Sequence, residues 1–275
     1  MPFTYLAHQA PALAIKQRWP TSFDGTALAL GTMAPDWAYA FNGSRLAFDA
    51  HSLLGVVVFC TPVAVVAATV LRRVSPTLFT YAPNPQRMPL RQLRILALRR
   101  PPFATTAFSA ALGALTHVAW DLFTHNDRWG PRHISWLRSE AFSVIGHSVT
   151  WAKVLQYASH TLGSAVAVLL LARMLRSGEL LRWYGVVSDP GTLGRHEGFT
   201  RFVIVTLIGV VAGGSWAALG DGLPAQTIRV SVGLAVGLVA ASLVCRRVVA
   251  VGVRSERQPT DLIRQTESTP SVNDE

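Results

Sequence analysis

The chain has 275 residues, half of them hydrophobic, and only 15% of them are charged. Soluble domains carry about 25% charged residues, so this composition excludes an ordinary soluble domain and predicts a multi-pass membrane protein. The net charge of +10 comes almost wholly from arginines that lie between apolar stretches. Such a distribution is typical of the cytoplasmic loops of membrane proteins, and no nucleic acid partner is expected. Cys60 and Cys245 both lie in apolar runs and support neither a disulfide framework nor a zinc–thiolate site.

The first 41 residues contain no segment that should cross a bilayer. Residues 1–25 are of mixed polarity, and the apolar residues 26–41 are fewer than the roughly 20 that a span needs. Pro35 also interrupts them, because proline breaks the hydrogen bonding of a helix interior. A half-helix ending near Pro35 and Asp36, or a short buried helix, fits this stretch better.

Five later segments are long and apolar enough to be transmembrane helices. They cover residues 52–71, 103–123, 151–175, 202–219 and 228–244. Arg72 and Arg73 close the first segment, and Thr150 can cap the third. The predicted fold class is therefore all-α: an integral membrane bundle of about five transmembrane helices, with short N-terminal helices.

Charge and composition divide the chain into three expected regions. These are a membrane core domain over residues 1–175, an additional transmembrane hairpin over 176–250, and a disordered cytoplasmic tail over 251–275. The loop 72–102 holds seven arginines and no acidic residue, which predicts a cytoplasmic location. Alternation of the spans then places the N-terminus outside and the C-terminus in the cytoplasm.

Within this basic loop, residues 89–100 alternate leucine and arginine at near-helical spacing. They can form an interfacial helix on anionic headgroups or a solvated basic linker, and the sequence leaves both open.

The most informative stretch is residues 114–125, where His117, Asp121 and His125 follow one another at intervals of four. Such intervals keep the three side chains on one stripe of a helix. Imidazoles and a carboxylate are costly in an apolar segment unless they pair, bind a metal or face water. The predicted topology places Asp121 and His125 at the outer end of the bundle, and it brings His51 and Asp36 to the same end.

Histidine and aspartate are suitable ligands for zinc or a similar divalent ion. His117 and His125 lie about 12 Å apart along the helix, so one ion should not bind both. Either Asp121 bridges two ions, or one histidine donates its ring N–H to a ligand. We expect His51, Asp121 and His125 to be the primary ligands and His117 to be the least certain one. Asp36 or Asp121 is the candidate general base.

Four motifs resemble an uncharacterised bacterial membrane family, domain of unknown function number 4184. They are Met1-Pro-Phe-Thr with His8, Gly31-Thr-Met-Ala-Pro-Asp36, His51-Ser-Leu-Leu-Gly55, and residues 113–125, within a match of about residues 1–175. Their order is also distantly similar to membrane-bound metal-dependent hydrolases and to zinc-dependent phospholipases C. By that analogy the metal ligands would be His8, Asp36, His51, His117, Asp121 and His125.

One departure from the analogy concerns the third apolar segment. The soluble zinc-dependent phospholipases C have a further His-x-x-x-Glu motif, whereas this chain has Gln156 and His160 at the comparable place. Without the carboxylate, these two residues are candidates for supporting the ligands rather than for binding a third ion. His8 can join the site only if residues 1–25 lie outside or fold into the bundle from that side.

The sequence therefore predicts a membrane-bound, metal-dependent hydrolase of the bacterial inner membrane. It would act near the outer leaflet on a phosphoester or lipid-linked substrate. The expected cofactor is a divalent metal, with zinc the first choice, and the expected partners are the bilayer and an amphiphilic small molecule. The alternative is a non-enzymatic transporter or scaffold whose polar stripe only lines a path or holds helices together.

Overall fold

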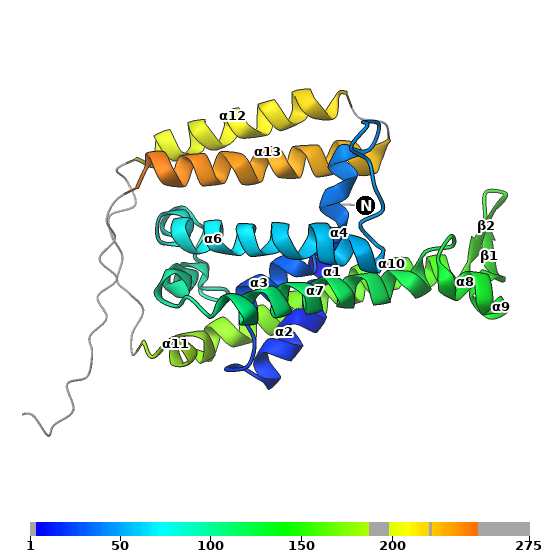
Figure 1. Ribbon diagram of the computed structural model, residues 1–275, viewed down its shortest axis with the longest axis horizontal. Helices are drawn as coiled ribbons and strands as arrows, with labels where there is room; N and C mark the ends of the chain where they lie inside the picture. Colours follow the sequence, from blue (N-terminus) through cyan, green and yellow to red (C-terminus); the bar gives the residue numbers. More distant parts are fainter. Residues whose placement is uncertain (1–3, 187–197, 220–221, 247–275) are drawn as a thin grey trace, which may run out of the picture.

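Five long helices lie side by side in the computed structural model, which describes residues 4–186, 198–219 and 222–246 (Figure 1). They are α6 (Thr61–Tyr81), α7 (Phe103–Thr124), α10 (Trp151–Arg176), α12 (Phe199–Ala217) and α13 (Leu223–Val244). The helices α12 and α13 pack against each other along one edge of the bundle (Figure 1). The predicted tail, residues 251–275, lies outside the described residues, and the division of the chain at residue 175 stays a prediction.

Four helical segments of the described chain are long and apolar enough to cross a membrane. They are Leu53–Tyr81, Trp151–Arg176, Phe199–Ala217 and Leu223–Val244. The expectation of an all-α, multi-pass membrane fold is thereby confirmed. The helix α7 forms where the second span was predicted, but it is not among the four. Its polar stripe lowers its hydropathy, since His117 and Asp121 interrupt the apolar sequence.

The first span is longer than the predicted 52–71. It begins with α5 (Leu53–Gly55), continues through η2 (Val56–Cys60), which is one turn of π-helix, and ends with α6 at Tyr81. Arg72 does not end the helix, because its guanidinium is buried and forms an ion pair with Asp24. The charge that suggested a boundary is therefore neutralised inside the bundle.

Residues 4–41 form only short helices, so no single helix there crosses a bilayer. They are α1 (Thr4–Ala7), α2 (Gln9–Arg18), α3 (Gly25–Gly31), α4 (Ala34–Trp37) and the 3₁₀ helix η1 (Ala38–Phe41). Pro35 is the second residue of α4 rather than the end of a helix, in a position where its missing N–H costs nothing. The helices α1 and α2 pack against α10, where Gln17 donates to the carbonyl of Leu170.

The two ends of the bundle differ in character (Figure 1). One end carries α8 (Trp129–His133), α9 (Ser135–Arg138) and a hairpin of antiparallel strands, β1 (Glu140–Val144) and β2 (His147–Thr150). No hairpin was predicted from the sequence in this loop between the second and third predicted spans. The other end carries the 3₁₀ helix η3 (Leu90–Leu98) and α11 (Glu179–Tyr184).

Arginines from α6, from the segment between η3 and α7, and from the residues after α13 meet at the second end. Arg73, Arg100 and Arg246 line one cavity there together with the paired Arg72. The 89–100 stretch forms η3, in which Arg94 and Ile95 are buried. It is thus packed onto the bundle and is not a solvated linker, whereas its contact with anionic headgroups stays a prediction.

Candidate metal centre

The polar stripe of α7 lies in the interior of the molecule. His117 and Asp121 are buried, and His125 follows the helix directly, with its backbone N–H donating to the carbonyl of Asp121. The stripe therefore has to be satisfied by neighbouring helices rather than by solvent.

Close contact between α3 and α7 fixes the orientation of His117. A Cβ atom on Gly113 would lie 2.2 Å from the carbonyl oxygen of Leu28, so only glycine permits this approach. The approach brings the carbonyl of Thr32 to 2.7 Å from Nδ1 of His117. A carbonyl oxygen only accepts, so Nδ1 carries the donated hydrogen and Nε2 is the nitrogen that points into the cluster.

Asp36 and His51 complete a first group of donor atoms around His117 and Asp121. Nε2 of His51 lies 3.6 Å from Oδ1 of Asp36 and 3.5 Å from Oδ2 of Asp121. Nε2 of His117 lies 3.6 Å and 3.3 Å from the same two oxygens. These separations exceed the usual hydrogen-bond range, and neither Nε2 atom has a hydrogen-bond partner among the described residues.

The spacing of this group matches that of ligands around a metal ion. Donor atoms placed about 2.0–2.2 Å from one tetrahedral ion lie about 3.3–3.6 Å from each other. The two nitrogens and two carboxylate oxygens have the nitrogen–oxygen separations that such an ion requires.

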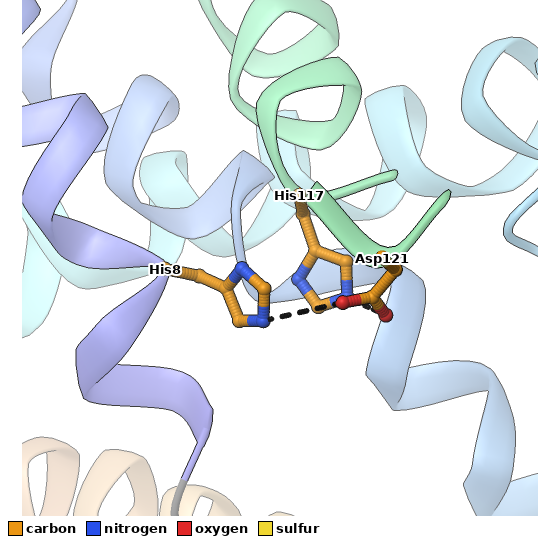
Figure 2. A group of neighbouring side chains, drawn as sticks. All are labelled: His8, His117 and Asp121. Atoms are coloured by element: carbon orange, nitrogen blue, oxygen red, sulfur yellow. Dashed lines mark ion pairs between the residues drawn. The ribbon is translucent and has the colours of Figure 1, made fainter. Parts of the chain in front are cut away.

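A second group forms on the other oxygen of Asp121. Nε2 of His8 lies 3.7 Å from Oδ1, and Nδ1 of His125 lies 3.6 Å from the same atom. Figure 2 shows the His8 ring beside His117, with its nitrogen directed at the carboxylate; the two rings stack with centroids 3.8 Å apart. The donor atoms that lie within 4.8 Å of one another on this side belong to His8, His117 and Asp121, and Asp121 presents one oxygen to each group.

Gln156 on α10 supports the second group. Its side-chain amide is 2.8 Å from Nε2 of His125. A rotated amide would accept Nε2–H through its oxygen and leave Nδ1 of His125 to face Asp121. His160 lies one turn further along α10, with its ring edge against Tyr157. The predicted supporting pair is therefore split, since only Gln156 contacts a member of the cluster.

The charges of the cluster are those of a cation site. Burial opposes a charge on His51, but the carboxylates of Asp121 and Asp36 outweigh it and raise the pKa of His51 to about 9. Burial and the adjacent His117 lower the pKa of His8 to about 3. The two buried carboxylates thus require positive charge between them, from a proton on His51 or from a metal ion.

The arrangement differs from the predicted one in two respects. His51 and His125 face opposite oxygens of Asp121, so these three residues do not surround one ion position. His117, predicted to be the least certain member, lies at the centre of the cluster and contacts both Asp36 and Asp121. The physical reason is the close packing of α3, which brings Asp36 down to the level of His117.

Two tyrosines near the cluster carried no sequence signal. The Tyr5 hydroxyl is buried without a hydrogen-bond partner among the described residues, and burial together with the charge of Asp36 raises its pKa. The ring of Tyr39 lies 5.6 Å from that of His51, and burial and the same carboxylate raise its pKa to about 12. Both residues therefore remain neutral donors beside the carboxylates.

Comparisons with known proteins give one match. Neither the curated proteins nor the solved structures contain a sequence or fold that matches this chain. A family described as a domain of unknown function (DUF4184) matches residues 1–251, so the resemblance extends well beyond the predicted 1–175 and includes α12 and α13. With its buried histidine–aspartate cluster inside the matched region, the chain belongs to the DUF4184 family.

Proposed function

We propose that this protein is a membrane-embedded hydrolase that holds two divalent ions through its buried histidines and aspartates. The observation that carries the proposal is the group of Asp36, His51 and His117, whose donor atoms lie within 4.8 Å of one another. Its two imidazole nitrogens are buried and have no hydrogen-bond partner among the described residues. Zinc is the first choice, because imidazole nitrogen and carboxylate oxygen suit it. His8, Asp36, His51, His117, Asp121 and His125 are the proposed ligands.

The proposed reaction is hydrolysis of a phosphoester. A bound divalent ion would polarise a phosphoryl oxygen and lower the pKa of water. Asp36 or Asp121 would accept a proton from the attacking water at a carboxylate oxygen. The water oxygen bonds to phosphorus, the bond to the leaving oxygen breaks, and the proton passes to that leaving oxygen.

The proposed orientation places the cluster toward the outer leaflet. The arginines that gather at the opposite end of the bundle support it, because cytoplasmic loops carry an excess of arginine and lysine. A fusion of a topology reporter at residue 87 should report a cytoplasmic location. A periplasmic signal would reverse the orientation and move the cluster to the inner leaflet.

Metal analysis tests the proposal. Purified protein is loaded with zinc, desalted, and analysed by inductively coupled plasma mass spectrometry. We expect up to two zinc ions per wild-type chain and less than a tenth of that in Asp121→Asn. Asp127→Asn is the matched control, since Asp127 is an exposed aspartate near the cluster.

The same preparations are assayed with bis(p-nitrophenyl) phosphate, a water-soluble phosphodiester. Hydrolysis that requires zinc and disappears in Asp121→Asn supports a hydrolase. Zinc binding without any phosphoesterase activity would favour a transporter or scaffold, and protein that retains no metal would refute the metal centre.

A further inference from the structure

An apolar pocket adjoins the candidate metal centre, between the N-terminal helices, α7 and α10. Its volume is about 360 Å³, within the roughly 300–1,000 Å³ of small-molecule sites. Ala7, Pro11, Trp120, Ala158, Leu162 and Val166 are among its lining residues. Ser159 also lines it, but its hydroxyl already donates to the carbonyl of Gln156. Apart from His8 and the Trp120 indole, the pocket therefore offers a ligand little but hydrocarbon surface.

His8 belongs both to the pocket and to the candidate metal centre. It lines the pocket, while its Nε2 lies 3.7 Å from Oδ1 of Asp121 and its ring stacks on His117. A molecule in the pocket would therefore contact a residue that itself contacts the bridging carboxylate.

The pocket runs along α10 away from the cluster. It extends from Leu155, next to Gln156, to Val166, which is about 16 Å along the helix at 1.5 Å per residue. Gln156 contacts His125, so the Leu155 end lies level with the cluster. The Val166 end lies deeper in a helix that is long and apolar enough to span the bilayer.

This direction matches that of a lipid in the same leaflet. A lipid keeps its headgroup at the interface and extends its chain toward the bilayer centre, parallel to the spanning helices. Leu162 at the pocket is 66% exposed on the outside of α10, so the pocket borders the space that bilayer chains fill. A cavity of about 150 Å³ already admits benzene, so this one has room for a run of methylenes.

We propose that this pocket binds one hydrocarbon chain of an amphiphilic substrate, and we name it the acyl pocket. The chain would lie between α2 and α10, and the phosphoester on the headgroup side of that chain would lie beside His8 and Asp121. The binding of a chain stands on the pocket alone, whereas the cleavage of the ester rests on the proposed hydrolase function. The substrate class is thus a lipid whose scissile phosphoester joins its headgroup to the part that carries the hydrocarbon chain.

Photolabelling tests the acyl pocket independently of any reaction. The protein is reconstituted in phosphatidylglycerol vesicles that contain a phosphatidylglycerol with a diazirine in one acyl chain, and labelled peptides are identified by mass spectrometry. We expect label on the 155–166 segment, reduced at least fivefold in Ala158→Trp, whose indole would fill the pocket. Thr161→Trp, at an exposed position of the same helix that does not line the pocket, is the control and should label like the wild type.

Leu162→Trp provides a second variant, because its exposed side chain can be enlarged without entering the core. It should reduce labelling of the pocket if chains enter past this residue. Equal labelling of the wild type and both pocket variants would overturn the proposal.

Activity and metal content separate this inference from the proposed function. Ala158→Trp should keep its zinc and its activity on bis(p-nitrophenyl) phosphate, while its KM for a phospholipid rises about tenfold. Pocket labelling in a protein without zinc would refute the hydrolase and leave the acyl pocket standing. Zinc and phosphodiesterase activity without pocket labelling would refute the acyl pocket and leave the proposed hydrolase standing.

Discussion

At the scale of single residues, hydrogen bonds to the ring nitrogens that face away from the cluster orient its histidines. His117 donates Nδ1–H to the Thr32 carbonyl, and His125 meets the Gln156 amide. Such partners fix the ring and its tautomer, so the remaining nitrogen is the ligand. Side chains that never touch an ion therefore help to determine its affinity.

Replacing Gln156 by leucine tests this role. Loss of a group that orients a ligand typically lowers metal affinity about 10–100-fold, and we expect that range for the ion held by His8, Asp121 and His125. Competition with a chromogenic zinc chelator measures the change. His160→Gln, one turn along α10, should bind zinc like the wild type; an equal loss in both variants would contradict the assignment.

A proton on His51 should compete with the metal. Because the carboxylates of Asp121 and Asp36 raise the pKa of His51 to about 9, the metal-free protein is protonated there at pH 7. Zinc must displace this proton, so zinc affinity should fall roughly tenfold for each pH unit below 9. Calorimetry in two buffers of different ionisation enthalpy counts the released protons. A binding enthalpy that is independent of the buffer would show that His51 is neutral or is not a ligand.

At the scale of elements, the contact between α3 and α7 positions the cluster. Gly31 and Gly113 meet backbone to backbone, since a Cβ on either would lie 2.2 Å from a carbonyl oxygen of the other helix. This contact holds the Thr32 carbonyl against His117 and places α4, with Asp36, beside α7. The motifs Gly31–Asp36 and 113–125 therefore position the cluster together, through this one helix contact.

Gly113→Val should separate the two helices. Overpacking of this kind typically costs about 1–3 kcal/mol, and here it should also weaken zinc binding because His117 loses its carbonyl partner. Gly214→Val is the matched control, because a Cβ on Gly214 meets nothing within 4 Å. Thermal unfolding with and without zinc checks both effects. Unchanged zinc binding in Gly113→Val would mean that the α3 contact is structural only.

The sequence predicted the parts of the site that are local in the chain and missed those that depend on packing. Intervals of four residues define the stripe of α7 without any knowledge of its neighbours. The partner of His117 is a backbone carbonyl, which any residue at position 32 could supply, so no side-chain pattern reveals it. The predicted end of the first span was wrong for a similar reason. Arg72 marks the predicted boundary, but it pairs with Asp24, 48 positions earlier in the sequence, and stays inside the helix. The β1–β2 hairpin was also not predicted from the sequence of its loop.

At the scale of the whole molecule, the proposed ions would join separate parts of the chain. Their ligands come from the α1–α2 junction, α4, the start of the first span, and α7. Ligand bound only to the folded state stabilises it by about 2.7 kcal/mol at a hundred times Kd. We expect the unfolding temperature to fall by several degrees in EDTA and to recover with zinc. Asp121→Asn should show neither change; a wild type that is indifferent to EDTA would argue against a structural contribution from the ions.

The packing of α2 against α10 also has a consequence for how the protein is made. Gln17 bonds to Leu170, a residue 153 positions further along the chain, and the His8 side of the cluster closes only against α10. During synthesis, the N-terminal helices can therefore pack against α10 only after the first span and α7 have entered the membrane. The His8 and His125 side of the cluster would gain its support from α10 only when α10 inserts, so tight metal binding on that side would be a late step of biogenesis. A ribosome-stalled chain that ends before residue 150 should accordingly retain less zinc than one that includes α10.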